Sequence, residues 1–127
     1  QFIELREIDG DRRFPIVVGK PEAYAIDRRL KGVEPPRPQT HELLAEVMHT
    51  LGGTLKKIII DNLTGGTFYA KLLLDNGVEE FVVDSRPSDA IALGISMNVP
   101  IFVEDKVLEE VEKDVDSYES PDDFGWE

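Results

Sequence analysis

The 127-residue sequence contains no cysteine and no long run of apolar residues. Without cysteine the chain forms no disulfide, no thiolate metal site and no cysteine nucleophile. No apolar segment approaches the length of about 20 residues that a transmembrane helix needs, and no secretory signal pattern is present. We therefore expect a cytoplasmic protein that has no membrane partner.

Basic residues are also scarce. The chain has 14 lysines and arginines against 26 aspartates and glutamates, which gives a net charge of −12. Six of the acidic residues and none of the basic ones lie in residues 114–127, so removing these six charges leaves −6 on residues 1–113. A net negative charge repels a phosphate backbone and counts against sequence-independent binding to nucleic acid. We predict one domain over residues 1–113 and a disordered acidic tail over residues 114–127.

Strands and helices follow from the hydrophobic pattern. Residues 2–8 alternate between apolar and polar, as a half-buried strand does, and Asp9-Gly10 is a hairpin-turn dipeptide. Thr40 is a favourable N-cap for the second helix, whose Leu43, Leu44, Val47 and Leu51 fall on one apolar face. Strands are predicted at 2–8, 14–18, 55–61, 67–74, 79–83 and 100–103, and helices at 22–31, 41–51, 87–97 and 105–111.

The two halves of the chain resemble each other at an offset of 67 residues. Asp9-Gly10 corresponds to Asn76-Gly77, Phe14 to Phe81, and residues 22–26 to residues 89–93. We predict an α+β fold of two repeats, about 1–53 and 54–113, each with three strands followed by two helices. The first repeat lacks a counterpart of strand 55–61, so we expect about a dozen residues before Gln1 in the natural chain. Chance similarity between two amphipathic hairpin–helix units is the alternative.

The stretch from Asp84 to Leu93 has the most concentrated polar chemistry. A strand runs into it and a helix leaves it. Pro87 suits the first helical position, and Arg86, which precedes a proline, is biased toward extended geometry. Ser88 and Asp89 then fall in the first helical turn, where side-chain oxygens can pair with free backbone N–H groups.

These residues resemble the signature of the bifunctional nuclease domain of bacteria and plants. Further similar stretches are Gly32–Pro38 with Thr40–Leu44, then Gly66–Ala70 and Val99–Val103, so that the resemblance covers residues 2–111. It implies that the duplicated unit closes into one barrel-like sheet with helices packed on it. It also implies a nuclease that acts on DNA or RNA and associates with itself, most simply as a dimer.

Phosphodiester hydrolysis usually needs a divalent metal held by carboxylates, so we expect Mg²⁺ or Mn²⁺. Asp84 and Asp89 are the predicted catalytic metal ligands, since a strand end and a first helical turn can point into one pocket. Glu22, the counterpart of Asp89 in the first repeat, is a third candidate ligand.

The remaining candidate residues serve the substrate. Arg86 is expected to bind a phosphate by two parallel hydrogen bonds and to belong to the catalytic group. Ser85 and Ser88 are predicted to contact the substrate near the helix N-terminus. His41 is a candidate general base, because histidine ordinarily titrates near neutral pH.

Each candidate has a structural alternative. Asp89 can simply cap its helix, Asp84 can pair with Arg86 as a clasp, and His41 can be a solvent-exposed residue of a first helical turn. The whole chain then has an alternative function, as a non-catalytic oligomeric binding or regulatory domain that associates through exposed hairpin edges.

Overall fold

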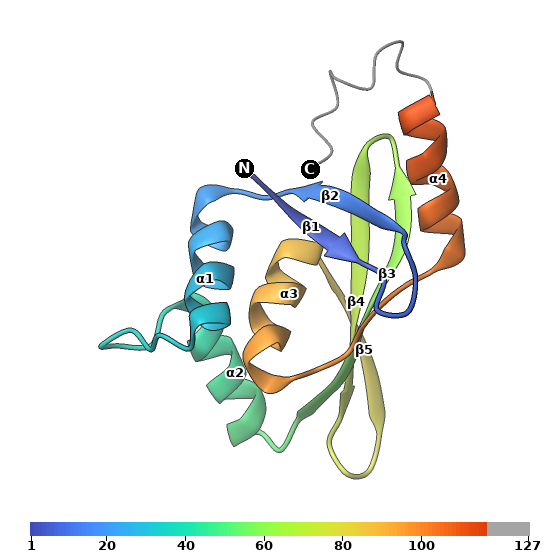
Figure 1. The fold of residues 1–127 in the computed structure, drawn as a ribbon. Coiled ribbons are helices and arrows are strands. Elements are labelled where there is room, and N and C mark those ends of the chain that lie inside the picture. Colours follow the sequence, from blue (N-terminus) through green and yellow to red (C-terminus); the bar gives the residue numbers. More distant parts are fainter. Residues whose placement is uncertain (117–127) are drawn as a thin grey trace.

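The computed structural model describes residues 1–116, with side chains through Lys113, and has a mixed α+β fold (Figure 1). Strands and helices follow the sequence pattern closely. Residues 117–127, and with them most of the predicted acidic tail, lie outside the described part. The elements are β1 (Phe2–Arg6), β2 (Arg13–Val17), α1 (Lys20–Lys31), α2 (Thr40–Thr50), β3 (Thr54–Thr64), β4 (Thr67–Asp75), β5 (Glu80–Ser85), α3 (Pro87–Gly94), the 3₁₀ turn η1 (Ile95–Met97), β6 (Ile101–Val103) and α4 (Asp105–Asp116).

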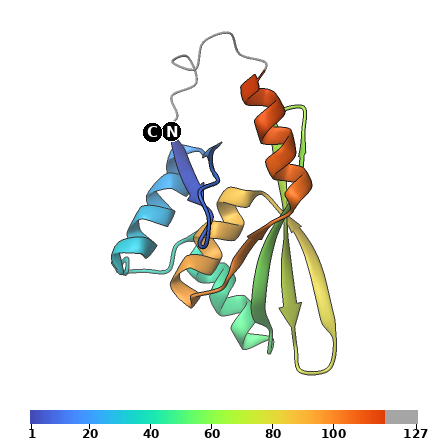
Figure 2. The same ribbon diagram turned by 45° about the vertical axis from the view of Figure 1, so that its right-hand side comes forward.

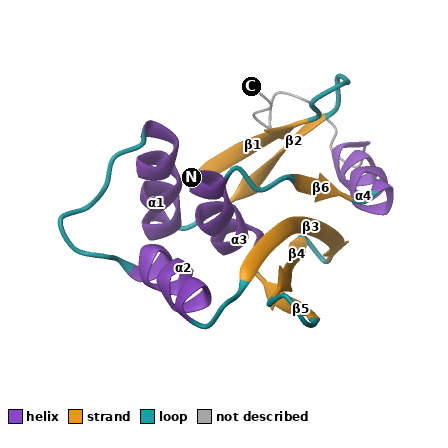
Figure 3. Cartoon of the chain, turned by 90° about the horizontal axis from the view of Figure 1, so that it is seen from below, coloured by secondary structure: helices purple, strands orange, loops and turns teal. Residues whose placement is uncertain are grey.

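The strands form two sheets. One is the antiparallel hairpin β1–β2, and the other has the order β5-β4-β3-β6, in which only β6 runs parallel to its neighbour β3. Figure 3 shows β6 between β3 and the β1–β2 hairpin. The predicted single barrel-like sheet is therefore wrong for the described residues, because no ladder of hydrogen bonds joins β1 to β6.

The core lies between the four-stranded sheet and the helices. Ile58, Ile60, Leu93 and Val107 are fully buried there, since alternate side chains of β3 face α3 and α4. A second apolar cluster joins α1 to α3 through Ala25, Ile26, Ile91 and Ala92. The small alanines let the two helix backbones approach closely, so α3 lies between α1 and the sheet (Figure 2).

Several helix ends differ from the sequence prediction, and α1 begins at Lys20 rather than at residue 22. The N-cap of α2 is Gln39 rather than Thr40, because Gln39 and Glu42 form a capping box in which the Gln39 N–H donates to Glu42 Oε1 over 3.0 Å. The helix predicted at 87–97 ends at Gly94 and continues as η1. The last helix continues past Val111 to Asp116, so the first residues of the predicted tail are helical.

Helix α2 has an unexpected environment. None of its residues is buried, and the apolar face predicted from its sequence remains exposed, with Leu51 at 79% exposure. No described helix is long and apolar enough to cross a membrane.

Candidate active site

The strand-to-helix junction has the predicted local geometry. Strand β5 ends at Ser85, and Arg86 is the N-cap of α3 with extended angles of φ −70° and ψ 143°. Pro87 then starts the helix, where its missing N–H costs nothing. In this geometry the Arg86 side chain lies at the N-terminus of α3 and is 66% exposed.

Four side chains meet at this junction, and we call them the Arg86 cluster: Glu22, His41, Arg86 and Asp89. Asp89 Oδ2 accepts a hydrogen bond from Arg86 Nε over 2.9 Å, and Asp89 Oδ1 lies 3.0 Å from His41 Nε2. Arg86 Nη1 lies 3.4 Å from Glu22 Oε1. The cluster therefore joins α1, α2 and the start of α3, which are far apart in the sequence.

Asp89 is thus an ion-pairing residue. Among the residues that the structure describes, its side chain bonds to His41 and Arg86 and to no backbone N–H of α3. The interpretation of Asp89 as a helix cap is wrong, because Arg86 and His41 occupy both carboxylate oxygens.

The charges of the cluster perturb two of its members. Burial tends to raise the pKa of Asp89, but the hydrogen bonds from His41 and Arg86 and their positive charges outweigh it and hold that pKa below its usual value. The hydrogen bond to Asp89 in turn raises the pKa of Arg86, which remains charged. Asp89 is therefore an ionised acceptor at neutral pH.

His41 is held rather than exposed. Its side chain is only 12% exposed, so the interpretation as a solvent-exposed histidine is wrong. An ionised carboxylate only accepts hydrogen bonds, so Nε2 of His41 carries the proton that faces Asp89. In the neutral imidazole, Nδ1 is then the nitrogen that can take up a proton.

Asp84 lies in a different environment. It pairs in register with Lys71 of β4, whose neighbours Ala70 and Leu72 point into the core, so Asp84 and Lys71 are on the outer face of the sheet. Lys71 Nζ lies 3.0 Å from Asp84 Oδ1 and 3.6 Å from Asp61 Oδ2. The proposed clasp between Asp84 and Arg86 is wrong, since Arg86 pairs with Asp89 and Glu22 instead.

The two serines also differ from each other. Ser88 is buried, with 7% exposure, which leaves little of it for a substrate to contact. The Ser85 hydroxyl donates to the Arg86 carbonyl over 2.8 Å and is on the surface side of the junction. Only Ser85 lies where a bound substrate can reach it.

A metal ion does not fit the Arg86 cluster. The Arg86 guanidinium already pairs with both carboxylates, so a cation would have to displace it. Among the described residues, no three His, Asp or Glu side chains are placed so that they could hold one metal ion together. Asp84, Asp89 and Glu22 therefore do not meet at one site, because Asp84 pairs with Lys71 whereas Asp89 and Glu22 pair with Arg86. A functional role for each of the three residues stays a prediction.

The sequence interpretation missed the contact that holds α2, and with it His41, against α1. Arg29 of α1 is only 7% exposed and donates to Glu42 Oε2 over 2.6 Å, and it also reaches Ser96 and the Leu93 carbonyl. Glu42 thereby ties α2 to α1 one residue after His41. A signal was present in the Gln39-x-x-Glu42 capping-box spacing, but the arginine partner lies 13 residues away and gives no sequence pattern.

The bifunctional nuclease domain matches residues 3–116 of this chain. The chain belongs to the bifunctional nuclease domain family. The Arg86 cluster and the Asp84 site both lie within the matched region, so the family assignment covers every candidate residue.

Three relatives share between 28% and 47% sequence identity with this chain. An uncharacterized protein of Mycobacterium tuberculosis is 47% identical over 104 residues, which cover 82% of this chain and 62% of that protein. Bifunctional nuclease 1 of Oryza sativa subsp. indica is 28% identical over 109 residues, covering 83% of this chain and 33% of that protein. Bifunctional nuclease 2 of Oryza sativa subsp. japonica is 29% identical over 105 residues, covering 80% and 32%. The chain thus spans less than two thirds of the relatives' length.

Proposed function

We propose that this chain is a nuclease that hydrolyses phosphodiester bonds of DNA or RNA at the Arg86 cluster. The family assignment supports a nuclease-related function. The observation that carries the choice of site is the placement of an exposed guanidinium beside a carboxylate-held histidine, through one shared carboxylate.

Each group has one task in this proposal. Arg86 binds a non-bridging oxygen of the scissile phosphate. His41 Nδ1 takes the proton from the attacking water as its oxygen bonds to phosphorus, and the bond from phosphorus to the leaving oxygen breaks. Asp89 is a positioning residue, because it fixes the tautomer and orientation of His41. The leaving oxygen takes a proton from the solvent or from the imidazolium.

The local charge limits how strongly a phosphate binds. When His41 is neutral, the two negative charges of Glu22 and Asp89 outweigh the single positive charge of Arg86. A substrate phosphate must therefore compete with two carboxylates for the guanidinium. Because only one cation meets the phosphate, binding should weaken as salt rises with a shallow slope of about −0.7 to −0.9 in log K against log salt.

The test is cleavage of labelled single-stranded RNA and DNA by purified protein. We expect His41→Ala to lose about 10²–10⁴-fold in rate, the usual contribution of a general base, and Arg86→Gln to lose activity as well. Arg37→Gln is the matched control, since Arg37 is exposed on the α1–α2 connector and has no ion pair to a described residue. Equal activity in all variants would overturn the site, and no cleavage by the wild type would overturn the function.

The metal requirement is tested in the same assay. Reactions with Mg²⁺, Mn²⁺ or EDTA show whether cleavage depends on a divalent ion, and Asp84→Asn shows whether the outer face of the sheet contributes. Activity that EDTA leaves intact would contradict the predicted metal and agree with the ion pairs of the Arg86 cluster.

A second candidate is a non-catalytic oligomeric binding domain located in the cytoplasm. The observation in its favour is the exposed apolar face of α2 together with the edge strand β5, whose Val82 is exposed. A homodimer is the predicted form. Sedimentation of the wild type and Val82→Glu tests it, with loss of a dimer expected, whereas a monomeric wild type would contradict it.

A further inference from the structure

One face of the four-stranded sheet is not covered by any described helix, and we call it the outer face. Along β3 its residues alternate with the buried Ile58 and Ile60, and the strand register extends it to β4, β5 and β6. Figure 3 shows α1, α2 and α3 together on the other side of the sheet. Val107 and Val111 of α4 also cluster with Ile58 and Ile60. The outer face includes Lys57, Ile59, Tyr69, Lys71, Asp84 and Phe102.

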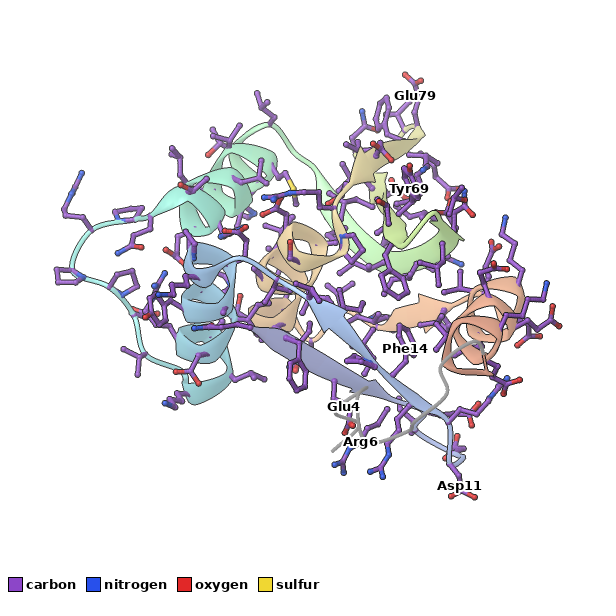
Figure 4. All side chains as sticks on the ribbon, turned by 90° about the horizontal axis from the view of Figure 1, so that it is seen from above. Glu4, Arg6, Asp11, Phe14, Tyr69 and Glu79 are labelled. Atoms are coloured by element: carbon purple, nitrogen blue, oxygen red, sulfur yellow. The ribbon has the colours of Figure 1, made fainter. Side chains whose placement is uncertain are left out.

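Two aromatic rings are accessible on the outer face. Phe102 of β6 is 51% exposed and Tyr69 of β4 is 39% exposed. Figure 4 shows Tyr69 beside the sheet and apart from α1 and α2. Phe102, Ile59 and Lys71 lie in one row across the sheet, and Tyr69 is two residues from Lys71 along β4. With a strand spacing of about 4.8 Å and a rise of about 3.4 Å per residue, the two aromatic residues are about 12 Å apart at Cα, so each ring can stack on a different base.

Two lysines lie on the same face. Lys57 Nζ lies 5.5 Å from the centroid of the Phe102 ring and forms no ion pair with residues 1–113. A cation–π contact at an exposed site is weak, so a base can take the ring while the ammonium moves to the phosphate of that nucleotide. Lys71 is already held by Asp84 and Asp61, at 3.0 and 3.6 Å. Of the two lysines, Lys57 is therefore the one available to a phosphate.

These charges favour a nucleic acid over a protein as the partner. An apolar protein surface docked on this face would bury the Lys57 ammonium without a partner, and it would take the pair of Lys71 with Asp84 out of water. Both changes are costly. A flexible single strand instead brings a phosphate to Lys57 and leaves the Lys71–Asp84 pair in solvent.

The outer face also borders the proposed site of cleavage. Ala70 of β4 pairs with Ser85, the last residue of β5, so Tyr69 lies beside the point where the chain leaves the sheet. Arg86 follows there as the N-cap of α3, with its side chain largely exposed. A nucleotide stacked on Tyr69 is thus next to the junction that carries the Arg86 cluster.

We propose that the outer face of the four-stranded sheet binds single-stranded RNA or DNA. Phe102 and Tyr69 each stack on one base, and Lys57 binds a phosphate. A duplex is not expected to bind in this way, because its bases are stacked on one another and their faces are not free. The link from this face to cleavage at Arg86 rests on the proposed nuclease function, whereas binding at the sheet does not.

Fluorescence anisotropy of labelled single-stranded RNA and DNA oligonucleotides, with the matching duplex for comparison, tests the proposal. The length of the recovered oligonucleotide shows separately whether it was cleaved. We expect Phe102→Leu and Tyr69→Leu each to weaken single-strand binding about 5- to 150-fold, the contribution of one stacked base. Lys57 adds a second cation to the one at the Arg86 cluster, so Lys57→Gln should make the slope of log K against log salt shallower by about 0.7.

Two further variants are controls. Tyr24 of α1 is an exposed ring outside the outer face, at 59% exposure, and Tyr24→Leu should bind the single strand as the wild type does. Phe102→Trp keeps an aromatic ring on β6 and should keep the affinity. Far-ultraviolet circular dichroism should be the same for all variants, because each substituted side chain lies on the surface.

Three outcomes would overturn the proposal. One is a wild type that binds no single strand or binds the duplex equally well. Another is unchanged affinity in Phe102→Leu and Tyr69→Leu; if the wild type still cleaves, the nuclease function is kept and this binding face is rejected. The third is sedimentation that shows a dimeric wild type and monomeric variants, which would assign the face to a second copy. Weaker binding by the variants of a chain that cleaves nothing would support the binding face and reject the nuclease function alone.

Discussion

Helix α2 packs on the core through the partly buried Ala45 and Met48 and is also held by polar contacts, which lead to the sharpest prediction. None of its residues is buried, whereas Arg29 of α1 binds Glu42 at 2.6 Å with only 7% of its own side chain exposed. Removing one partner of a fully buried ion pair costs about 3–5 kcal/mol. Because the Glu42 side chain is 22% exposed, we expect Arg29→Ala to lower the free energy of unfolding by about 2–3 kcal/mol.

The neighbouring arginine is the matched control. Arg28 Nη2 lies 3.9 Å from the other oxygen of Glu42, and its side chain is 25% exposed. Arg28→Ala should therefore cost less than about 1 kcal/mol. Urea denaturation followed by far-ultraviolet circular dichroism measures both. Equal losses for the two variants, or a loss below 1 kcal/mol for Arg29→Ala, would refute the view that Arg29 holds α2.

A local measurement separates undocking of α2 from general destabilisation. If Arg29 anchors the helix, amide exchange in α2 should speed up in Arg29→Ala while α3 stays protected. The same variant should also weaken the contact between His41 and Asp89, because His41 reaches Asp89 only while α2 is docked. Uniform acceleration across both helices would contradict the anchor.

Three further predictions concern other parts of the molecule. The folded-state pKa of Asp89 is lowered, so its ion pairs stabilise the protein above the unfolded pKa of about 3.9 and are lost as the pH falls through the folded-state pKa. The unfolding free energy of Asp89→Asn should therefore be below that of the wild type at pH 7, and this difference should disappear in acid. A difference that grows in acid would contradict the ion pairs. Ile58→Ala should cost about 2–5 kcal/mol in chemical denaturation because the side chain is fully buried, and Val82→Ala on the exposed edge strand should cost the monomer almost nothing. Gly32→Ala should lower the thermal midpoint, with a loss of about 1 kcal/mol, because Gly32 ends α1 at φ 69° and a side chain is strained there; an unchanged midpoint would refute this.

Local structure was largely predictable from the sequence. The junction at Arg86-Pro87 follows from the missing N–H of proline and its steric effect on the preceding residue, which act within one or two residues. The alternating pattern of β1 and the Asp9-Gly10 turn likewise depend on near neighbours. Such interactions involve residues that are adjacent in the sequence, and the corresponding elements are found close to the predicted places.

The pairing of distant polar side chains was not predictable. Asp84 and Asp89 are five residues apart, yet Asp84 meets Lys71 on the outer face of the sheet while Asp89 meets His41 of α2. Nothing near His41 in the sequence indicates this partner, because the contact exists only after α2 docks on α3. The sequence predicted one apolar face on α2, and Leu43, Leu44 and Val47 of that face are exposed in the described structure.

The sequence by itself therefore determined the α+β class, the order of the elements and the family, because these depend on periodicity, turn chemistry and short motifs. Only the tertiary structure decided which charges meet at Arg86, that the Arg86 guanidinium pairs with both Glu22 and Asp89, and which strand edges are unpaired within residues 1–116. The physical reason is range: backbone preferences act over a few residues, whereas ion pairs and sheet closure join side chains and strands brought together only by packing of the whole chain.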